Sequence, residues 1–206
     1  MSSRGAETDP WDIRSRVRLA LSLRVLPARV ARFAWRANGC ARGIGDDFSL
    51  TSAVRPAELA ELLSIARGRG AVVELGTGTA WSAIALALDD GARRVISYDS
   101  FVRHDRDAYL GLAGGRVRDR IELRNEPDSN GPRAGDPPVE LLFIDSSHDC
   151  ESVLAAFRAW RTALAPGAVV VFHDYDHPGY PGVRDAVVEL GLVGRRIGGL
   201  FAWRAP

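Results

Sequence analysis

Two short segments, "FIDSSHDC" and "FHDYD", concentrate side chains that can do acid–base chemistry. The first places Asp145 at the end of an apolar run and His148 three residues later, and the second places His173 and Asp174 at the end of another apolar run. Histidine exchanges protons near neutral pH, and carboxylates and imidazoles both bind divalent cations. If the two runs form neighbouring strands, about 4.8 Å apart, these side chains converge. The pattern predicts a catalytic corner.

Helix capping is the competing explanation for the acids after the first run. An acid after a strand often accepts hydrogen bonds from the first turn of the next helix, which we expect to begin near Cys150. Capping accounts readily for Asp149, less readily for Asp145, and not for His148. We expect His177 to be structural, in a segment, "YDHPGYPGV", that is either a rigid turn or a wall of an acceptor pocket.

From Ala71 onward, short β-branched runs alternate with helical stretches such as "AWSAIALALDD" and "CESVLAAFRAWRTAL". This alternation predicts an α/β fold of the doubly wound, Rossmann-like kind, with a mostly parallel seven-stranded sheet and helices on both faces. The tail is expected to contribute a helix end and one or two closing strands, for which an antiparallel sense is open. The other strands are expected at residues 71–75, 94–99, 121–124, 139–145 and 168–174.

The N-terminal part of the chain has a different pattern. Residues 11–42 alternate arginines with apolar side chains at three- or four-residue steps, which predicts two amphipathic helices interrupted at Pro27, and a third helix is expected near Pro56. We therefore predict a helical cap over residues 1–50 and a catalytic domain over residues 51–206. Basic amphipathic helices can also contact a membrane surface or a second subunit, which leaves a homodimer open.

Composition narrows the class of protein. A chain of 206 residues suits one core, and a net charge of +1 gives no bulk field to attract nucleic acid. All 27 basic residues are arginine, which we interpret as a compositional bias. The two cysteines fit neither a disulfide framework nor a zinc site, and we find no signal peptide and no run near the roughly 20 apolar residues of a membrane span. A cytoplasmic protein without stable membrane insertion is expected.

A glycine turn follows the first predicted strand, in "VVELGTGTAWSA". Gly76 and Gly78 permit a tight turn and let backbone N–H groups approach a ligand at the positive end of a helix that opens near Ala80. A nicotinamide-binding fingerprint would have a third glycine where this sequence has Trp81. The motif alone is compatible with several nucleotide-like ligands.

Two acidic residues bear on the identity of that ligand. Glu74 lies beside the turn, where its charge would oppose a pyrophosphate but suits an ammonium or sulfonium group. Asp99 closes the second predicted strand and can accept hydrogen bonds from two ribose hydroxyls, which serves NAD equally well. Glu74 is therefore the main residue that distinguishes a dinucleotide from S-adenosylmethionine, and it favours S-adenosylmethionine.

From about residue 50 to residue 190 the chain resembles class I S-adenosylmethionine-dependent methyltransferases. "ELGTGTAWS" is similar to the glycine turn of catechol and caffeoyl-CoA type O-methyltransferases, with Ala80 in place of a usual glycine, a departure that we expect to be tolerated. In that family the serine matched by Ser82 holds the methionine carboxylate of the cofactor, and Phe101 would lie near its adenosine. The cofactor set that the resemblance implies is Glu74, Gly76, Thr77, Gly78, Ser82, Asp99, Ser100 and Asp145.

"FIDSSHD" and "LAPGAVVVFHDYD" resemble segments of metal-dependent O-methyltransferases, most closely a bacterial family that includes sugar O-methyltransferases of macrolide and aminocoumarin biosynthesis. The resemblance implies His148 as general base, and Asp145, His173 and Asp174 as ligands of magnesium or manganese. His173 departs from the usual carboxylate or amide, and imidazole is a poor magnesium ligand. Either the metal is softer, or His173 binds substrate or a local partner, or no metal binds.

The expected activity is transfer of a methyl group from S-adenosylmethionine to a hydroxyl of a small-molecule acceptor, with Asp145 and His148 as catalytic residues. Two alternatives stay open at this point. One is an NAD(P)-dependent oxidoreductase on a related fold, which Glu74 and Trp81 disfavour. The other is a methyltransferase-like module that binds its ligand without turnover.

Overall fold

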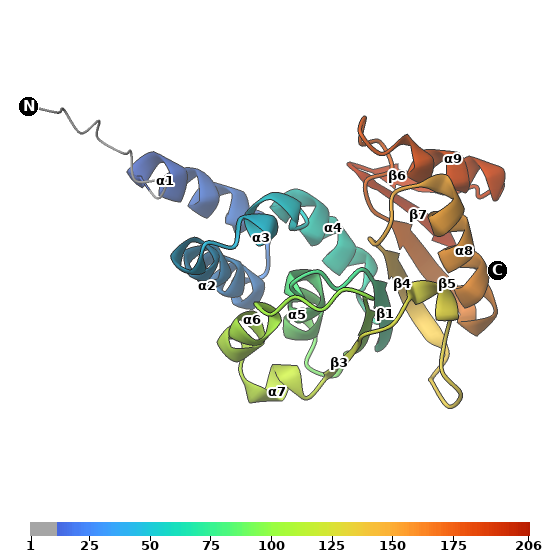
Figure 1. Cartoon of the computed structure of the whole chain (residues 1–206), viewed down its shortest axis with the longest axis horizontal. Coiled ribbons are helices and arrows are strands. Elements are labelled where there is room, and N and C mark those ends of the chain that lie inside the picture. Colours follow the sequence, from blue (N-terminus) through green and yellow to red (C-terminus); the bar gives the residue numbers. More distant parts are fainter. Residues whose placement is uncertain (1–11) are drawn as a thin grey trace, which may run out of the picture.

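The computed structural model describes residues 12–206 as a seven-stranded mixed sheet between helical layers (Figure 1). The order is β3-β2-β1-β4-β5-β7-β6; the first five strands in this order are parallel, and β7 runs antiparallel to β5 and β6. The predicted fold and the antiparallel end of the sheet are confirmed. The strands are β1 Ala71–Leu75, β2 Arg94–Tyr98, β3 Ile121–Arg124, β4 Val139–Ile144, β5 Leu164–Phe172, β6 Arg195–Ile197 and β7 Leu200–Arg204.

Helices cover both faces of the sheet because the strands present apolar side chains on both faces. In β4, Leu141 and Phe143 pack in one hydrophobic cluster, and Leu142 and Ile144 pack in another on the opposite face. Figure 1 shows α8 and α9 on one side and α5 and α6 on the other. The helices of the domain are α5 Trp81–Asp89, α6 Arg106–Ala113, α7 Gly115–Arg118, α8 Cys150–Trp160 and α9 Pro181–Glu189.

The N-terminal helices pack on the α5 side of the sheet. Pro27 is the N-cap of α2, so the predicted interruption there is confirmed. Val30 and Phe33 of α2 are buried in the same cluster as Ile84 of α5. The boundary predicted at residue 50 stays a prediction, and α3 was not expected. The helices of this part are α1 Ile13–Ser22, α2 Ala28–Ile44, α3 Asp47–Ser52 and α4 Pro56–Ile65.

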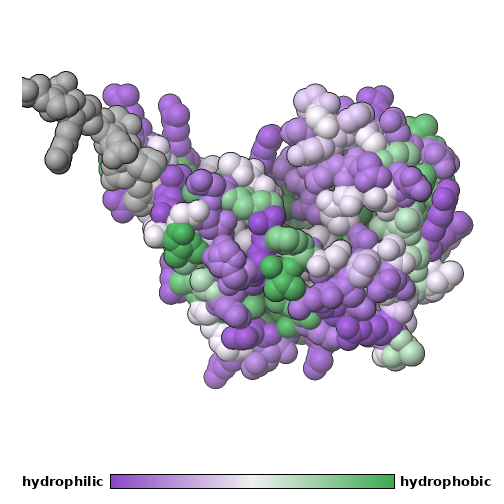
Figure 2. Space-filling model, in the orientation of Figure 1, coloured by the Kyte–Doolittle hydropathy of each residue, from purple (hydrophilic) through white to green (hydrophobic). Residues whose placement is uncertain are grey.

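Three short 3-10 turns complete the described elements: η1 Leu23–Val25, η2 Asp128–Asn130 and η3 Arg161–Ala163. Residues 1–11, where we predicted the absence of a signal peptide, lie outside the described part of the chain. Within the described part, no helix is both long and apolar enough to cross a membrane. Figure 2 shows hydrophilic side chains over most of one face, with smaller apolar groups between them.

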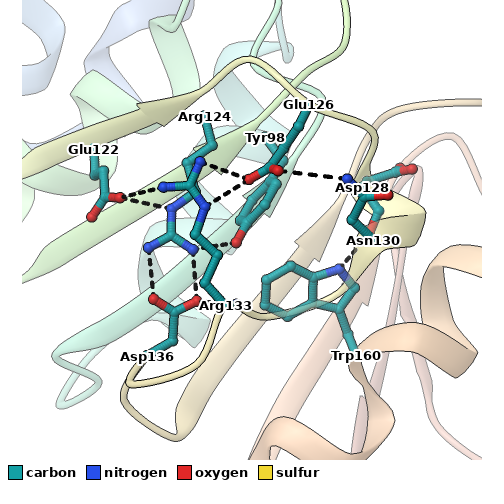
Figure 3. A network of polar contacts seen from close by, with 9 residues as sticks. All are labelled: Tyr98, Glu122, Arg124, Glu126, Asp128, Asn130, Arg133, Asp136 and Trp160. Atoms are coloured by element: carbon teal, nitrogen blue, oxygen red, sulfur yellow. Dashed lines mark hydrogen bonds and ion pairs between the residues drawn. The ribbon is translucent and has the colours of Figure 1, made fainter.

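The long loop between β3 and β4 is fastened to the sheet by buried polar contacts (Figure 3). Arg124 donates to both carboxylate oxygens of Asp136, each at 2.6 Å, and it also donates to the Tyr98 hydroxyl. Trp160 Nε1 donates to the carbonyl of Asp128 at 2.8 Å. These contacts hold a turn-rich segment in place. The Ser146 hydroxyl, just after β4, also donates to the Asp128 carboxylate, which keeps Asp128 close to the carboxyl end of that strand.

Candidate active site

A cavity of about 530 Å³ opens at the carboxyl ends of β1, β2, β4 and β5. The strand order reverses between β1 and β4, which is where ligands bind in open α/β sheets. Most of the predicted site residues line it, whereas Glu74 lies behind the lining. Those on the wall are Gly76, Thr77, Gly78, Ser82, Asp99, Ser100, Asp145, His148, His173 and Asp174.

The glycine turn passes directly against the end of β4. Gly76 has a φ of 101°, and a Cβ on it would lie 2.0 Å from the carbonyl oxygen of Asp145. No other residue fits there, because both the conformation and the space exclude a side chain. Ala80, the N-cap of α5, also has a left-handed backbone with a φ of 69°. The departure from glycine is accommodated, but in a conformation that L-residues disfavour.

Glu74 is fully buried behind the turn. The Ser97 hydroxyl donates to its Oε2 at 2.5 Å, whereas its Oε1 has no hydrogen-bond partner. Burial raises the pKa of Glu74 to about 7, although the hydroxyls of Ser82 and Ser97 act in the opposite direction. An unpartnered, buried carboxylate oxygen is costly unless a ligand supplies a donor or a positive charge. This orphan oxygen fits the ammonium end of S-adenosylmethionine.

Asp99 is tied to the glycine turn by a buried arginine. Its Oδ2 accepts hydrogen bonds from the Gly78 N–H and from Arg106, both at 2.9 Å, and its Oδ1 accepts one from the Phe101 N–H at 2.8 Å. Arg106 also donates to the Gly78 carbonyl at 2.7 Å and to Asn125 at 3.1 Å. Asp99 can therefore accept further hydrogen bonds, such as those from ribose hydroxyls, mainly through Oδ1. Arg106 was not predicted, because nothing in the sequence distinguishes it from the other arginines.

The second half of the corner lies just beyond β5. His173 N–H still bonds to the Ile144 carbonyl at 3.0 Å, but the regular strand ends at Phe172, and Asp174 has a φ of 54°. Aspartate tolerates this left-handed conformation better than most residues. The break from strand alternation brings His173 and Asp174 to the same cavity as Asp145.

His173 is buried among three carboxylates. Its Nδ1 lies 2.9 Å from Asp145 Oδ1 and 3.4 Å from Asp174 Oδ2, and its Nε2 lies 3.4 Å from Glu58 Oε2. Burial lowers the pKa of His173, but the three carboxylates outweigh it and raise the value to about 12. His173 is thus a cation at neutral pH. Glu58, on α4, is a further residue that sequence analysis missed, because nothing in "AELAELL" distinguishes it from a surface acid.

His148 contacts Asp174, one of the three carboxylates around His173. Its Nε2 lies 3.2 Å from Asp174 Oδ2, yet this buried nitrogen has no aligned hydrogen bond. Although burial opposes it, the two histidines hold the pKa of Asp174 well below its usual value. Asp149 caps α8 by accepting from the Ser152 N–H at 2.9 Å, as the capping explanation predicted. Asp145, by contrast, lies in the cavity wall.

Three residues present ligand atoms that suit one metal ion. Oxygens of Asp145 and Asp174 and a nitrogen of His148 lie within 4.8 Å of one another, the one such group found among residues 12–206. His173 is outside this group, which differs from the predicted ligand set of Asp145, His173 and Asp174. The mixed oxygen and nitrogen donors fit manganese, iron or zinc better than magnesium. With such an ion bound, His148 would be a ligand and not a free base.

A family model described as "Methyltransferase domain" matches residues 73–175, which include the glycine turn and both halves of the corner. The chain belongs to this methyltransferase family. No curated protein matches the sequence. The family match covers the glycine turn and the ends of β2, β4 and β5 that line the cavity, whereas the wall formed by residues 48–58 lies outside it.

Solved structures of methyltransferases share the fold of this methyltransferase. The O-methyltransferase from Bacillus cereus in complex with SAH has a TM-score of 0.66 at 17% identity, covering 93% of this chain and 97% of that one. The O-methyltransferase TomG from Streptomyces achromogenes, involved in tomaymycin synthesis and solved with SAM, has a TM-score of 0.64 at 21% identity, covering 98% and 100%. A putative caffeoyl-CoA O-methyltransferase from Staphylococcus aureus has a TM-score of 0.64 at 12% identity, covering 95% and 100%.

Proposed function

We propose that this methyltransferase transfers the methyl group of S-adenosylmethionine to a hydroxyl oxygen of a small-molecule acceptor, with His148 as the general base. The observation that carries the proposal is the buried, unpartnered Nε2 of His148, 3.2 Å from Asp174 and in the same cavity as the glycine turn. A base for a hydroxyl needs a free nitrogen near neutral pH, within reach of the acceptor and the cofactor.

The cofactor is assigned to the end of the cavity beneath the glycine turn. Glu74 would meet the ammonium group, Ser82 the carboxylate, and Asp99 the ribose, while Gly76 and Gly78 let the backbone approach. Thr77, Ser100 and Asp145 complete the assigned contacts. Bound S-adenosylmethionine supplies the electrophilic methyl carbon. The protein's own contribution is to align the acceptor oxygen with that carbon and to exclude competing arrangements.

His148 would accept the proton of the acceptor hydroxyl as the oxygen attacks. Asp174, at 3.2 Å, stabilises the imidazolium that forms, and the low pKa of its carboxyl keeps it ionised for that task. Asp145 is assigned an indirect part in this form of the site, since its carboxylate is paired with His173 at 2.9 Å. The site therefore has a proton acceptor even without a metal.

A metal-assisted form of the same reaction is the second candidate, and the geometry of Asp145, His148 and Asp174 is the observation that favours it. A divalent ion would supply a positive charge that lowers the pKa of the acceptor hydroxyl. The two forms give His148 different tasks. Dialysis against EDTA followed by addition of magnesium, manganese or zinc separates them: turnover that survives EDTA excludes the metal form, and turnover restored only by an ion supports it.

The central test is cofactor binding followed by methyl transfer. We expect calorimetry to show binding of S-adenosylhomocysteine, without binding of NAD or NADP, and we expect labelled methyl transfer to at least one member of a panel of small hydroxyl compounds. The substitution His148→Ala should lower turnover at least 100-fold with cofactor affinity nearly unchanged. Asp149→Asn, one residue away in the helix cap, is the matched control and should retain turnover.

Each outcome has a defined meaning. Binding of NAD in place of S-adenosylhomocysteine would support the alternative of an NAD(P)-dependent oxidoreductase. Binding of S-adenosylhomocysteine without transfer to any acceptor would support an inert module. Equal turnover in wild type and His148→Ala would remove His148 as base. The homodimer and the cytoplasmic location stay predictions.

A further inference from the structure

Three rings form a stack at the acceptor side of the cavity. The Tyr180 ring lies between two imidazoles, with its centroid 4.1 Å from that of His148 at an interplanar angle of 18°, and 4.4 Å from that of His177 at 25°. His148 follows β4, whereas Tyr180 and His177 come from the segment between β5 and α9. The stack therefore joins two loops that are distant in sequence, and it ends on the proposed base.

The backbone around Tyr180 is built to keep the ring in that position. Tyr180 N–H donates to the carbonyl of His177 at 2.9 Å, and Gly179 N–H donates to His177 Nδ1 at 3.2 Å, which closes a tight turn. Two residues after Tyr180, a Cβ on Gly182 would lie 2.5 Å from the Cys150 nitrogen and 2.6 Å from the His148 carbonyl oxygen. Only a glycine allows the start of α9 to approach the His148 backbone this closely.

The imidazole of His148 needs such support. Its Nε2 has no aligned hydrogen bond, and its contact with Asp174 at 3.2 Å does not define the ring plane. Stacking on Tyr180 does define that plane, because two parallel rings in contact cannot rotate independently. Tyr180 in turn stacks against His177, so its ring is in contact with both imidazoles.

We propose that Tyr180 is a positioning residue, which fixes the ring plane of His148 so that Nε2 stays directed at the acceptor hydroxyl with Asp174 nearby, and that His177 supports the Tyr180 ring by stacking against it. The inference rests on the proposed function, in which His148 is the base. It assigns the segment "YDHPGY" a role in orienting a catalytic ring. Since the ring contact requires aromaticity and not the hydroxyl, phenylalanine should replace Tyr180.

The kinetic test compares Tyr180→Leu, Tyr180→Phe and wild type. Loss of the stack should lower kcat about 10- to 100-fold, the range expected when a catalytic group is misplaced, with KM for acceptor and cofactor within about twofold. Tyr180→Phe should retain wild-type kcat, and His177→Leu should give an intermediate loss. Val188→Ala, at an exposed position on α9, is the control for a general disturbance of that helix.

Several results would overturn the inference. An undiminished kcat in Tyr180→Leu would remove the positioning role. A change confined to the acceptor KM would show that Tyr180 is a binding surface, and a loss in Tyr180→Phe equal to that in Tyr180→Leu would assign the role to the hydroxyl.

A second measurement is independent of activity. Imidazole NMR of His148 should show a rigid ring in wild type and Tyr180→Phe, and a mobile one in Tyr180→Leu or, if that variant does not fold, in His177→Leu. A ring that stays rigid in the leucine variants contradicts this inference alone, whereas full turnover in His148→Ala contradicts the proposed function.

Discussion

His173 Nδ1 lies 2.9 Å from Asp145 Oδ1, so a cation of the protein itself occupies one side of the carboxylate that the resemblance assigns to a metal. Its other nitrogen faces Glu58 at 3.4 Å. With its pKa raised to about 12, His173 carries one positive charge and so offsets part of the negative charge of three neighbouring acids. Where the resemblance would place a carboxylate or amide, this chain has a positive charge, which reduces the demand for a metal cation at this point.

The substitution His173→Glu tests this balance. It would place a fourth carboxylate beside Asp145, Asp174 and Glu58, and breaking a buried ion pair of this kind costs about 3 kcal/mol of unfolding free energy. We expect urea denaturation to show a destabilised protein without metal and recovery of much of the loss with manganese. His104→Glu, at an exposed position outside the cavity, should show neither effect. A His173→Glu protein as stable as wild type in EDTA would contradict the charge-balance argument.

Glu74 predicts a pH dependence of stability in the cofactor-free protein. Its pKa in the folded state, about 7, is raised from 4.5, so the folded state binds this proton more tightly than the unfolded state. The stabilising contribution of the proton is complete below about pH 4.5 and is lost as the pH rises through 7. The shift corresponds to about 3 kcal/mol.

Other carboxylates titrate as well, so the measurement is the difference in unfolding free energy between Glu74→Gln and wild type. This difference should move in favour of the variant as the pH rises from 5 to 8. Glu61→Gln, on the exposed side of α4, should track wild type at every pH. A constant difference between Glu74→Gln and wild type would show that Glu74 does not titrate in this range.

The sheet was predictable because its signals are local. Runs such as "AVVEL" and "VELLFID" are apolar on both faces, which indicates parallel strands under helices, and the observed β1 and β4 differ from the predicted ranges by at most one residue. The catalytic corner followed from the rule that carboxyl ends of parallel strands share an edge. The position of His148 and Asp174 in one group depends on the left-handed backbone of Asp174, which no sequence pattern indicated.

The missed residues contribute through contacts distant in sequence. Glu58 and Arg106 lie on helices, and only tertiary packing decides which of their side chains point into the site. Arg106 donates four hydrogen bonds, but in the sequence it cannot be told apart from any other arginine. The stack on Tyr180 depends on the close approach that Gly182 allows, and that approach exists only once α8 and α9 have packed together.

Ala80→Gly should be nearly neutral for stability. The φ of 69° at Ala80 costs an L-residue roughly 1 kcal/mol that glycine avoids, but the substitution also removes a buried methyl group, worth about 0.8 kcal/mol, and gives the unfolded chain greater freedom. We expect the unfolding free energy to change by less than about 0.5 kcal/mol. Ala155→Gly, at an exposed position within α8, is the matched control and should lose about 1 kcal/mol. Equal losses at both positions would contradict the left-handed assignment.

Arg106 is expected to support cofactor binding without touching the reacting atoms. It joins Asp99 Oδ2 at 2.9 Å to the Gly78 carbonyl at 2.7 Å, so it fixes the distance between the ribose-binding carboxylate and the glycine turn. Arg106→Lys keeps the charge but loses the forked geometry, since a lysine cannot donate to several fixed acceptors at once. We expect affinity for S-adenosylhomocysteine to fall about tenfold by calorimetry, equivalent to about 1.4 kcal/mol. Arg118→Lys, an exposed pair with Asp107, should bind as wild type does. Unchanged affinity in Arg106→Lys would mean that Asp99 and the turn keep their spacing without the arginine fork.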